Sequence, residues 1–545
     1  MPDQTFDAVI IGAGAKGLTL AMYLTKYGGM DVALFERKHE TGGGWFSDEG
    51  AVPGFIADHC ATGTGAGYHF ATSLDFPEWE ALGGGDIPVP IGLGMIFKED
   101  NSCIVFYNRK ADPDYSKTRA SIARFSERDA ETWHKLYTNQ IRKYFGPAVM
   151  EWAHNPPPPP GTPDALEKLL LDPEAGFDPS WQDKTPLEVF SELFENKALI
   201  AGLLKYAQCF FGVHPEDKGA GFFGTMIVLS SLNPTVFGAV GGTHSWAHGS
   251  IKVIVGNGGR FFTHKEVEKI IMENGRATGI RLTDGTEIGA RKLVVSTVDP
   301  YCFAFNLMGE DYFNKSILDK VANLERRIIC NTWYTWALRE QPDYKAAAMN
   351  PDINMTSDYV VTVKDPEFLI RQNARRKQGL MPEELTINVY NHSISDITRG
   401  PEGKSVFITE DFVLPANAMS EREWLEFKKE HARQTVELWE QTTNNVNWDN
   451  VIGYLPITPY DTAGIPNYAP TGNWAIIDNI PGQIGRNRPI PEWSGYKVGY
   501  DNLYATGSAW PPYGNASCWQ GYNCYKVIAQ DLGLEKPWEK DGRPW

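Results

Sequence analysis

The sequence predicts an α/β protein whose parallel sheet is interrupted by a second domain of helices and strands. Two observations predict the sheet: an apolar run that ends in a glycine turn near the N-terminus, and a strand, glycine turn and helix near the C-terminus. Between them lie helix-capping signals and further strand patterns, which predict an inserted α+β domain.

The first element is a buried strand over residues 6–11, because β-branched side chains follow one another there without a breaker. Gly12, Gly14 and Gly17 then spell G-x-G-x-x-G. In that motif the first glycine makes the tight turn, the second lets backbone approach a diphosphate, and the third lets the helix pack on the strand. The helix expected from Ala15 to about residue 27 directs its first amides at the phosphates.

A second strand over residues 31–36 ends in Glu36, which follows Gly17 by 19 positions. An acid at this place accepts the ribose hydroxyls of a dinucleotide, so the unit is predicted to be Rossmann-like. Gly42, Gly43 and Gly44 mark a close backbone approach, for which a bound cofactor is one candidate and a flexible loop the alternative.

The middle of the chain is predicted to be helical between about residues 120 and 235. Ser126 and Thr185 are expected N-caps, and the latter begins a capping box. Residues 156–160 are five consecutive prolines, expected to form a stiff exposed linker. The apolar stretch 219–232 is too short to span a bilayer, so we expect a core helix, with a membrane-surface patch as the alternative.

The α/β pattern returns over residues 249–298, with hairpin turns at Asn274-Gly275 and Asp284-Gly285. Residues 301–480 are mixed, with strands at 360–363 and 385–390 and a helix over 420–440. A last strand near 502–508 and a helix over 516–532 are expected to complete the first sheet. The predicted dinucleotide-binding domain therefore comprises residues 1–75, 240–300 and 485–545, and the substrate domain comprises 76–239 and 301–484.

Composition excludes some partners. The formal net charge of −17 argues against nucleic acid and weakly against anionic lipid. The seven cysteines are odd in number and lack C-x-x-C spacing, so we expect reduced thiols in a cytoplasmic protein and no metal site. No basic, apolar signal segment precedes the first strand. Peripheral association with a membrane stays an open alternative.

Four motifs together carry a family resemblance. They are the glycine turn with its acid, the pair Gly42-Gly43, the strand containing Val267 with its following Gly275-to-Gly279 turn, and the run from Gly507 to Gly514. This combination resembles the FAD-dependent phytoene desaturase family, which includes carotenoid isomerases and retinol saturase. The resemblance covers about residues 1–70, 185–300 and 500–532, whereas 301–480 shows no clear match.

The resemblance implies a Rossmann-like FAD-binding domain with an inserted α+β substrate-binding domain. It implies that the backbone of Val267 holds the adenine and that amides at the start of the last helix, near Asn515 and Ala516, stabilise negative charge on the reduced flavin. The cofactor-binding residues expected are Gly12, Gly14, Ala15, Gly17, Glu36, Arg37, Gly43, Gly44, Val267, Gly507, Ser508, Asn515 and Ala516.

The catalytic candidates are Tyr513, Trp510 and His59. The resemblance implies that the first two lie near the flavin, where large rings would favour a compact substrate over a forty-carbon polyene. Their alternative role is a packing wall, and the alternative for His59, which follows Asp58, is a structural histidine.

The function expected is FAD-dependent dehydrogenation or desaturation, with hydride leaving a lipophilic alkene, terpenoid or alicyclic substrate. The alternatives are a flavin-dependent double-bond isomerase of the same fold, an amine oxidase with an aromatic cage, and a non-enzymatic flavoprotein. The glycine run at residues 256–259 lacks Rossmann context, so NAD(P)H is not expected as an obligate partner. Oxygen, a quinone or a carrier protein would accept the electrons.

Overall fold

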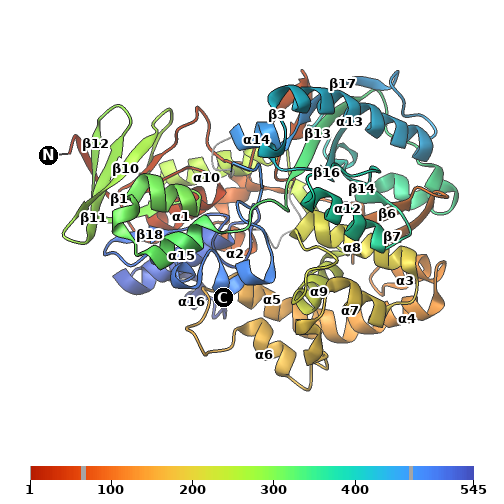
Figure 1. Cartoon of the computed structure of the whole chain (residues 1–545), viewed down its shortest axis with the longest axis horizontal. Coiled ribbons are helices and arrows are strands. Elements are labelled where there is room, and N and C mark those ends of the chain that lie inside the picture. The colour runs from red at the N-terminus through yellow and green to blue at the C-terminus, as the bar shows by residue number, and fades with distance from the viewer. Residues whose placement is uncertain (1, 63–68, 465–469) are drawn as a thin grey trace.

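Two seven-stranded sheets form the framework of the part of the chain that the structure describes. The structure is a computed structural model that describes residues 2–62, 69–464 and 470–545. Figure 1 shows one sheet in the left half of the molecule and the other in the right half, with a group of helices below the second.

The first sheet has the strand order β10-β11-β12-β1-β2-β9, and β18 pairs with the C-terminal part of β12. The central strand β1 runs parallel to both neighbours, and its Val9 lies between Val294 and Ala33. The strands predicted at both ends of the chain therefore join one sheet. Its members are β1 (Gln4–Ile11), β2 (Val32–Phe35), β9 (Arg260–Phe262), β10 (Val267–Glu273), β11 (Arg276–Leu282), β12 (Glu287–Ser296) and β18 (Leu503–Ala505).

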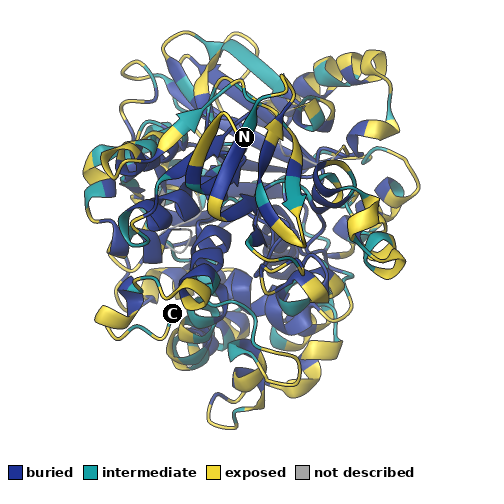
Figure 2. Ribbon diagram, turned by 90° about the vertical axis from the view of Figure 1, so that its left-hand side faces the viewer, coloured by how far each residue is buried: buried dark blue, intermediate teal, exposed yellow. Residues whose placement is uncertain are grey.

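The glycine turn joins β1 to helix α1 (Ala15–Lys26), as predicted. Gly12 has φ +92°, which favours glycine, and a Cβ on Gly17 would lie 2.3 Å from the Gly12 carbonyl oxygen. Helix α1 packs against α10 (His244–Gly256) and α15 (Trp519–Leu532). Figure 2, which faces this sheet, shows buried residues at its centre and exposed residues at its turns.

The last helix begins later than predicted. We expected it from Ala516, but α15 starts at Trp519. The Asn515 side chain accepts hydrogen bonds from the amide and the hydroxyl of Ser517, at 3.1 and 2.7 Å, and this local bonding holds the segment in a loop. The amides of Asn515 and Ala516 therefore belong to a loop that precedes the helix, which corrects their expected position at the helix start; their role toward a flavin stays a prediction.

The second sheet has the order β17-β13-β16-β15-β14-β6-β7 and is antiparallel except between β14 and β6. Helix α13 (Glu421–Thr442) packs on one face, and α8 (Lys197–Phe211) packs on the other. The predicted capping box at Ser420 begins α13. The strands are β6 (Ile91–Phe97), β7 (Ser102–Phe106), β13 (Asn331–Leu338), β14 (Thr356–Thr362), β15 (Ile387–Tyr390), β16 (Ser405–Phe412) and β17 (Val451–Ile457).

The predicted helical segment is present below the second sheet (Figure 1). Ser126 caps α4, and the capping box at Thr185 begins α7. The apolar stretch near residue 225 is the buried helix α9, so the expectation of a core helix is confirmed. The helices are α3 (Ser116–Ala123), α4 (Glu127–Leu136), α5 (Gly146–Ala153), α6 (Ala165–Leu171), α7 (Pro186–Leu193) and α9 (Gly221–Ser231).

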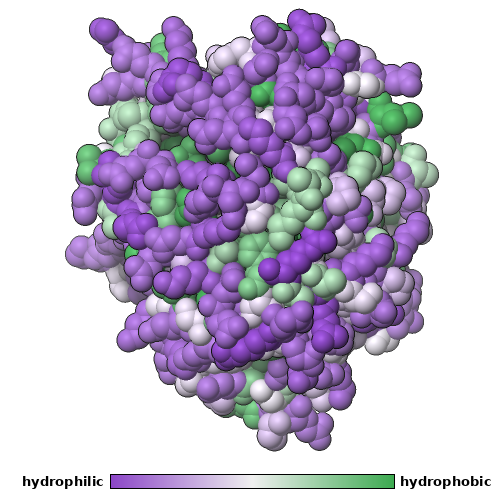
Figure 3. All heavy atoms as spheres, turned by 90° about the vertical axis from the view of Figure 1, so that its right-hand side faces the viewer, coloured by the Kyte–Doolittle hydropathy of each residue, from purple (hydrophilic) through white to green (hydrophobic). Residues whose placement is uncertain are grey.

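Two short two-stranded sheets, β3-β4 and β5-β8, and several minor helices complete the described part of the fold. Among the described residues, none of the helices combines the length and apolar character that a bilayer crossing requires. Figure 3 shows that the face on the right-hand side of Figure 1 is mainly hydrophilic, with smaller apolar groups. The remaining elements are β3 (Ser47–Val52), β4 (Phe55–Asp58), β5 (Asp86–Pro88), β8 (Val236–Ala239), α2 (Phe70–Asp75), α11 (Lys315–Ala322), α12 (Glu367–Lys377), α14 (Pro459–Gly464) and α16 (Pro537–Lys540).

Candidate functional site

A large cavity lies where the glycine turn of the first sheet faces the second sheet. It holds about 1020 Å³ of space, its open mouth included. The first sheet and its loops contribute the glycine-rich wall, and β13, β15, β16 and α8 contribute the opposite wall through Trp333, Tyr390, Glu410, Cys209 and Phe210. A cavity bounded by two domains is a usual place for a cofactor together with its substrate.

Most of the predicted cofactor-binding residues line this cavity. They come from segments nearly 500 positions apart in the chain, so the fold and not sequence proximity brings them together. These residues are Gly14, Ala15, Gly17, Gly43, Gly44, Gly507, Ser508, Asn515 and Ala516.

The other four predicted residues lie outside the cavity lining. Gly12 makes the turn itself. Glu36 is buried at the end of β2, where its carboxylate accepts hydrogen bonds from the amides of Ala13 and Lys38, both at 3.0 Å. Arg37 follows Glu36 in the chain, and its guanidinium lies 3.8 Å from the Glu266 carboxylate. The amide of Lys265 donates to the Glu36 carbonyl oxygen at 2.8 Å, so Val267, two residues further on, also lies close to Glu36. The structure thus groups these three at one end of β2.

The glycine triplet makes its close approach to the turn after β1. The Gly42 amide donates to the Ala13 carbonyl oxygen at 2.8 Å, and the Ala15 amide donates to the Gly42 carbonyl oxygen at 3.2 Å. Gly43 has φ +59°, and a Cβ there would lie 3.1 Å from the Gly14 Cα. A side chain at Gly43 would therefore press on the Gly14 backbone, which would have to move by a few tenths of an ångström.

Lys16 lines the cavity beside this turn and was not predicted, because it occupies a variable position of the motif. It is 6% exposed, and its ammonium group donates to the Asn515 carbonyl oxygen. Burial lowers the pKa of Lys16 to about 7. Helix α1 has no side-chain cap and no acidic residue in its first turn, so its positive end is left for an anion.

The opposite wall carries a carboxyl group that the sequence analysis missed. Glu410 on β16 is 5% exposed and lies opposite Trp333 in the β13 register. The indole N–H of Trp333 donates to Glu410 Oε1, and the Tyr390 hydroxyl donates to Oε2 at 3.0 Å. Burial raises the pKa of Glu410 to about 7. A single glutamate inside an unpredicted strand gives no sequence signal for this role.

None of the three predicted catalytic residues lines the cavity among the described residues. Trp510 is fully buried in the core of the first domain. The ring of Tyr513 packs against Trp519, with ring centroids 5.5 Å apart. His59 is buried beside Asp48, to which its Nε2 is hydrogen-bonded. Their catalytic roles stay predictions, and this packing fits the structural alternative stated for each.

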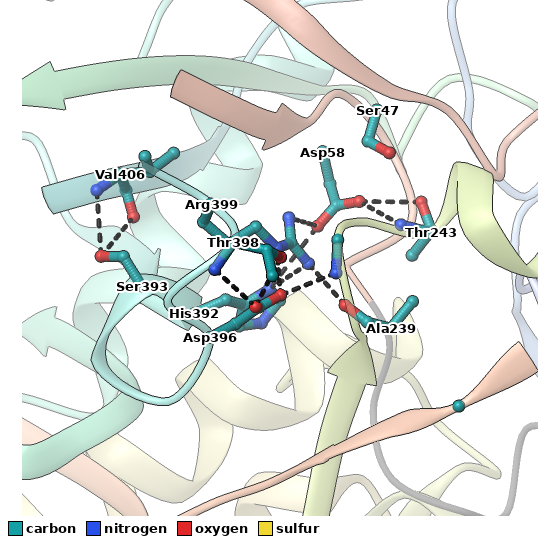
Figure 4. A network of polar contacts seen from close by, with 12 residues as sticks. Ser47, Asp58, Ala239, Thr243, His392, Ser393, Asp396, Thr398, Arg399 and Val406 are labelled. Carbon is teal, nitrogen blue, oxygen red and sulfur yellow. Dashed lines mark hydrogen bonds and ion pairs between the residues drawn. The ribbon is translucent and has the colours of Figure 1, made fainter. Parts of the chain in front are cut away.

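A buried network next to His59 joins the two halves of the molecule (Figure 4). Arg399 donates to Asp58 at 2.8 Å and to Asp396 at 3.2 Å, and the other side of Asp58 accepts from the amide and the hydroxyl of Thr243 at 2.7 and 2.9 Å. Burial opposes the charge of Asp58, but the Arg399 guanidinium and the His392 ring hold its pKa well below its usual range. The network fixes the segment that continues into the cavity wall at residues 60–62.

One group of potential metal ligands lies outside the cavity. Glu40, His244 and His248 place one ligand-type atom each within 4.8 Å of one another. Both histidines lie in the first turns of α10, where the positive end of the helix dipole opposes a cation. We propose no metal at this cluster.

Comparisons with known proteins fit this architecture. The family model of an NAD(P)-binding Rossmann-like domain matches residues 10–73. One subunit of the limonene dehydrogenase of Castellaniella defragrans is 25% identical over 559 residues, which cover 98% of this chain and 96% of that protein. A neurosporene-forming phytoene desaturase of Rhodobacter capsulatus is 26% identical over 437 residues, 73% of this chain and 71% of that protein.

A solved structure of a putrescine oxidase variant has a TM-score of 0.62 and 11% sequence identity, and the match covers 97% of this chain and 98% of that one. At that identity the likeness shows the fold alone. The predicted α/β class with a Rossmann-like domain is confirmed. The resemblance to phytoene desaturases that the sequence motifs carry is confirmed as well, since a relative named phytoene desaturase matches most of the chain.

Proposed function

We propose that this protein is an FAD-dependent oxidoreductase that removes a hydride from a lipophilic alkene. The observation that carries the proposal is the cavity that runs from the uncapped end of α1 to the aromatic wall of the second sheet. One end has the backbone groups and positive field that a diphosphate needs, and the other end is mostly apolar.

The residues present fit FAD. The first turn of α1, with Gly43 and Gly44 against it, forms a cradle that a side chain would fill, and Lys16 adds a buried amine beside it. Glu36 lies at the end of β2, where an acid reaches a ribose. Bound FAD supplies the two-electron acceptor for a hydride.

The chain's own contribution is orientation and exclusion of water. Trp333, Phe210 and Ile476 give the substrate end of the cavity apolar surfaces, which hold an alkene by shape and keep solvent from a reactive carbon centre. The names of the two relatives, limonene dehydrogenase and phytoene desaturase, support an alkene as the substrate class. Oxygen, a quinone or a carrier protein would then accept the electrons.

The test begins with the cofactor. The purified protein should release FAD on denaturation, and Gly14→Val should prevent binding because its side chain would enter the phosphate cradle. Gly495→Val is the matched control, since nothing lies within 4 Å of a Cβ at that position. Recovery of another nucleotide, or equal FAD content in both variants, would contradict the proposal.

The second part of the test uses anaerobic bleaching of the flavin by limonene, phytoene and putrescine. Bleaching by an alkene supports the proposal, and bleaching by putrescine alone would assign an amine oxidase. Rearrangement of an alkene without any electron acceptor would assign the isomerase alternative.

A further inference from the structure

Among the described residues, two carboxyl groups line the cavity, and they differ in their partners. Asp299 forms an ion pair with Arg326 at 3.0 Å. Glu410 takes part in no ion pair within the described ranges, and its hydrogen bonds come from the neutral donors Trp333, Tyr390 and Asn388. A buried carboxyl that is paired with a cation stays charged, whereas one held only by neutral donors can change its protonation state.

The groups that face Glu410 explain why it is not neutralised by a cation. Lys205 of α8 donates to the Thr386 carbonyl oxygen at 3.0 Å and lies 3.6 Å from Asp411, the neighbour of Glu410 on β16. Cys209 of α8 is a thiol, since burial raises its pKa to about 12. Tyr390 faces Glu410 from β15.

Asp358 faces it from β14, and burial, together with the nearby Glu410, raises the pKa of Asp358. Glu410 is therefore the group on this wall whose proton can move near neutral pH.

We propose that Glu410 is the proton acceptor of the reaction in this cavity, which rests on the function proposed above. Loss of a hydride breaks one C–H bond with both of its electrons and leaves a carbocation next to the double bond. That cation is quenched when a neighbouring C–H bond gives its electrons to a new C=C bond, or when water forms a C–O bond. Either route releases one proton, which goes to the carboxylate of Glu410; the hydride would go to bound FAD.

The geometry suits this role. Trp333 donates to one carboxylate oxygen of Glu410, Tyr390 donates to the other, and the Asn388 side chain adds a further hydrogen bond. A carboxylate offers about four lone-pair positions, so one stays open for the proton. These donors fix the orientation of the carboxylate. The aromatic rings of Trp333 and Tyr390 also line the cavity, and ring faces stabilise a nearby positive charge.

The variant that tests the proposal is Glu410→Gln, which keeps the shape and removes the basic carboxylate. It should bind FAD with an unchanged absorption spectrum and reduce it about 10²–10⁴ times more slowly with limonene, the typical contribution of general base catalysis. The parent rate should rise with pH through an apparent pKa near 7, and the variant should lack that rise. Asp358→Asn is the matched control, because Asp358 is a buried carboxyl on β14, which β15 separates from β16, and it is not among the described residues that line the cavity.

A readout that does not depend on turnover is the infrared carboxyl band of the protein. The protonated-carboxyl band that titrates near pH 7 should lose the intensity of one carboxyl in Glu410→Gln and keep its parent intensity in Asp358→Asn. The band that remains in Glu410→Gln includes Asp217, whose pKa burial also raises to about 7. A parent-like rate and pH profile in Glu410→Gln would overturn the proposal, as would an infrared titration unchanged by that substitution. Failure to recover FAD from any variant would instead contradict the proposed function.

Discussion

Replacing Arg399 by methionine tests whether the network around Asp58 holds the two halves of the molecule together. The side chains of Arg399 and Asp58 are 1% and 0% exposed. Methionine fills similar space but leaves Asp58 and Asp396 without their cation. Removing one partner of a buried ion pair typically costs about 3–5 kcal/mol, because the remaining charge stays buried and unpaired.

That cost converts to a modest change in melting temperature because the chain is long. At about 2.1 cal/mol/K of unfolding entropy per residue, a chain of 545 residues that unfolds as one unit loses about 1 °C per kcal/mol. We therefore expect Arg399→Met to lower Tm by about 3–5 °C in differential scanning calorimetry, and by more if one half unfolds alone.

The control is Arg281→Met, which removes the ion pair between Arg281 and Glu287. These two side chains are 46% and 39% exposed. Exposed pairs contribute about 0–1 kcal/mol, so the control should stay within about 1 °C of the parent. Adding Asp58→Asn to Arg399→Met should recover part of the loss, since the unpaired charge is then gone. Equal melting temperatures for the two single arginine variants would refute the reasoning.

Three further predictions concern the cavity and the turn. Glu36→Gln replaces the charged acceptor at the end of β2, which should weaken FAD binding about 10- to 100-fold in a fluorescence titration; unchanged affinity would exclude Glu36 as the ribose ligand. The flavin-free protein should gain stability as pH rises from 7 towards 10, because folded Lys16 has a pKa of about 7 and unfolded lysine holds its proton to about 10.4. Lys16→Met should lack this gain when Tm is measured across that pH range. Parallel profiles of Tm against pH for the parent and the variant would contradict the prediction. Tyr513→Phe should reduce flavin at the parent rate in stopped-flow measurements, since Tyr513 does not line the cavity; a loss of about 10²-fold or more would support its catalytic role.

The parts of the structure that the sequence predicts well are those set by local chemistry. The glycine turn, the capping boxes at Thr185 and Ser420 and the hairpin at Asn274-Gly275 each depend on residues a few positions apart, and all are present. The start of α15 was misplaced because a local bond between Asn515 and Ser517 competes with helix formation.

The cavity wall that the second sheet forms could not be predicted, because it depends on residues that are far apart in the sequence. Glu410 meets Trp333 and Tyr390 only because β16 lies between β13 and β15 in one particular register. A shift of one residue would place Glu410 on the other face of the sheet. Lys16 was missed because its burial depends on Asn515, which is almost the whole chain away.

The order of strands in the first sheet has a consequence for how the protein is made. β1 leaves the ribosome long before β12, yet it lies between β2 and β12, and Val9 pairs with Val294. At about 5–20 residues per second, β12 is synthesised on the order of tens of seconds after β1, and β18 later still. Throughout that time the apolar pair of β1 and β2 has an open hydrogen-bonding edge that favours aggregation. Biosynthesis of this protein should therefore depend on chaperones that shield the β1–β2 pair, and shortened chains that end before β12 should accumulate as insoluble protein.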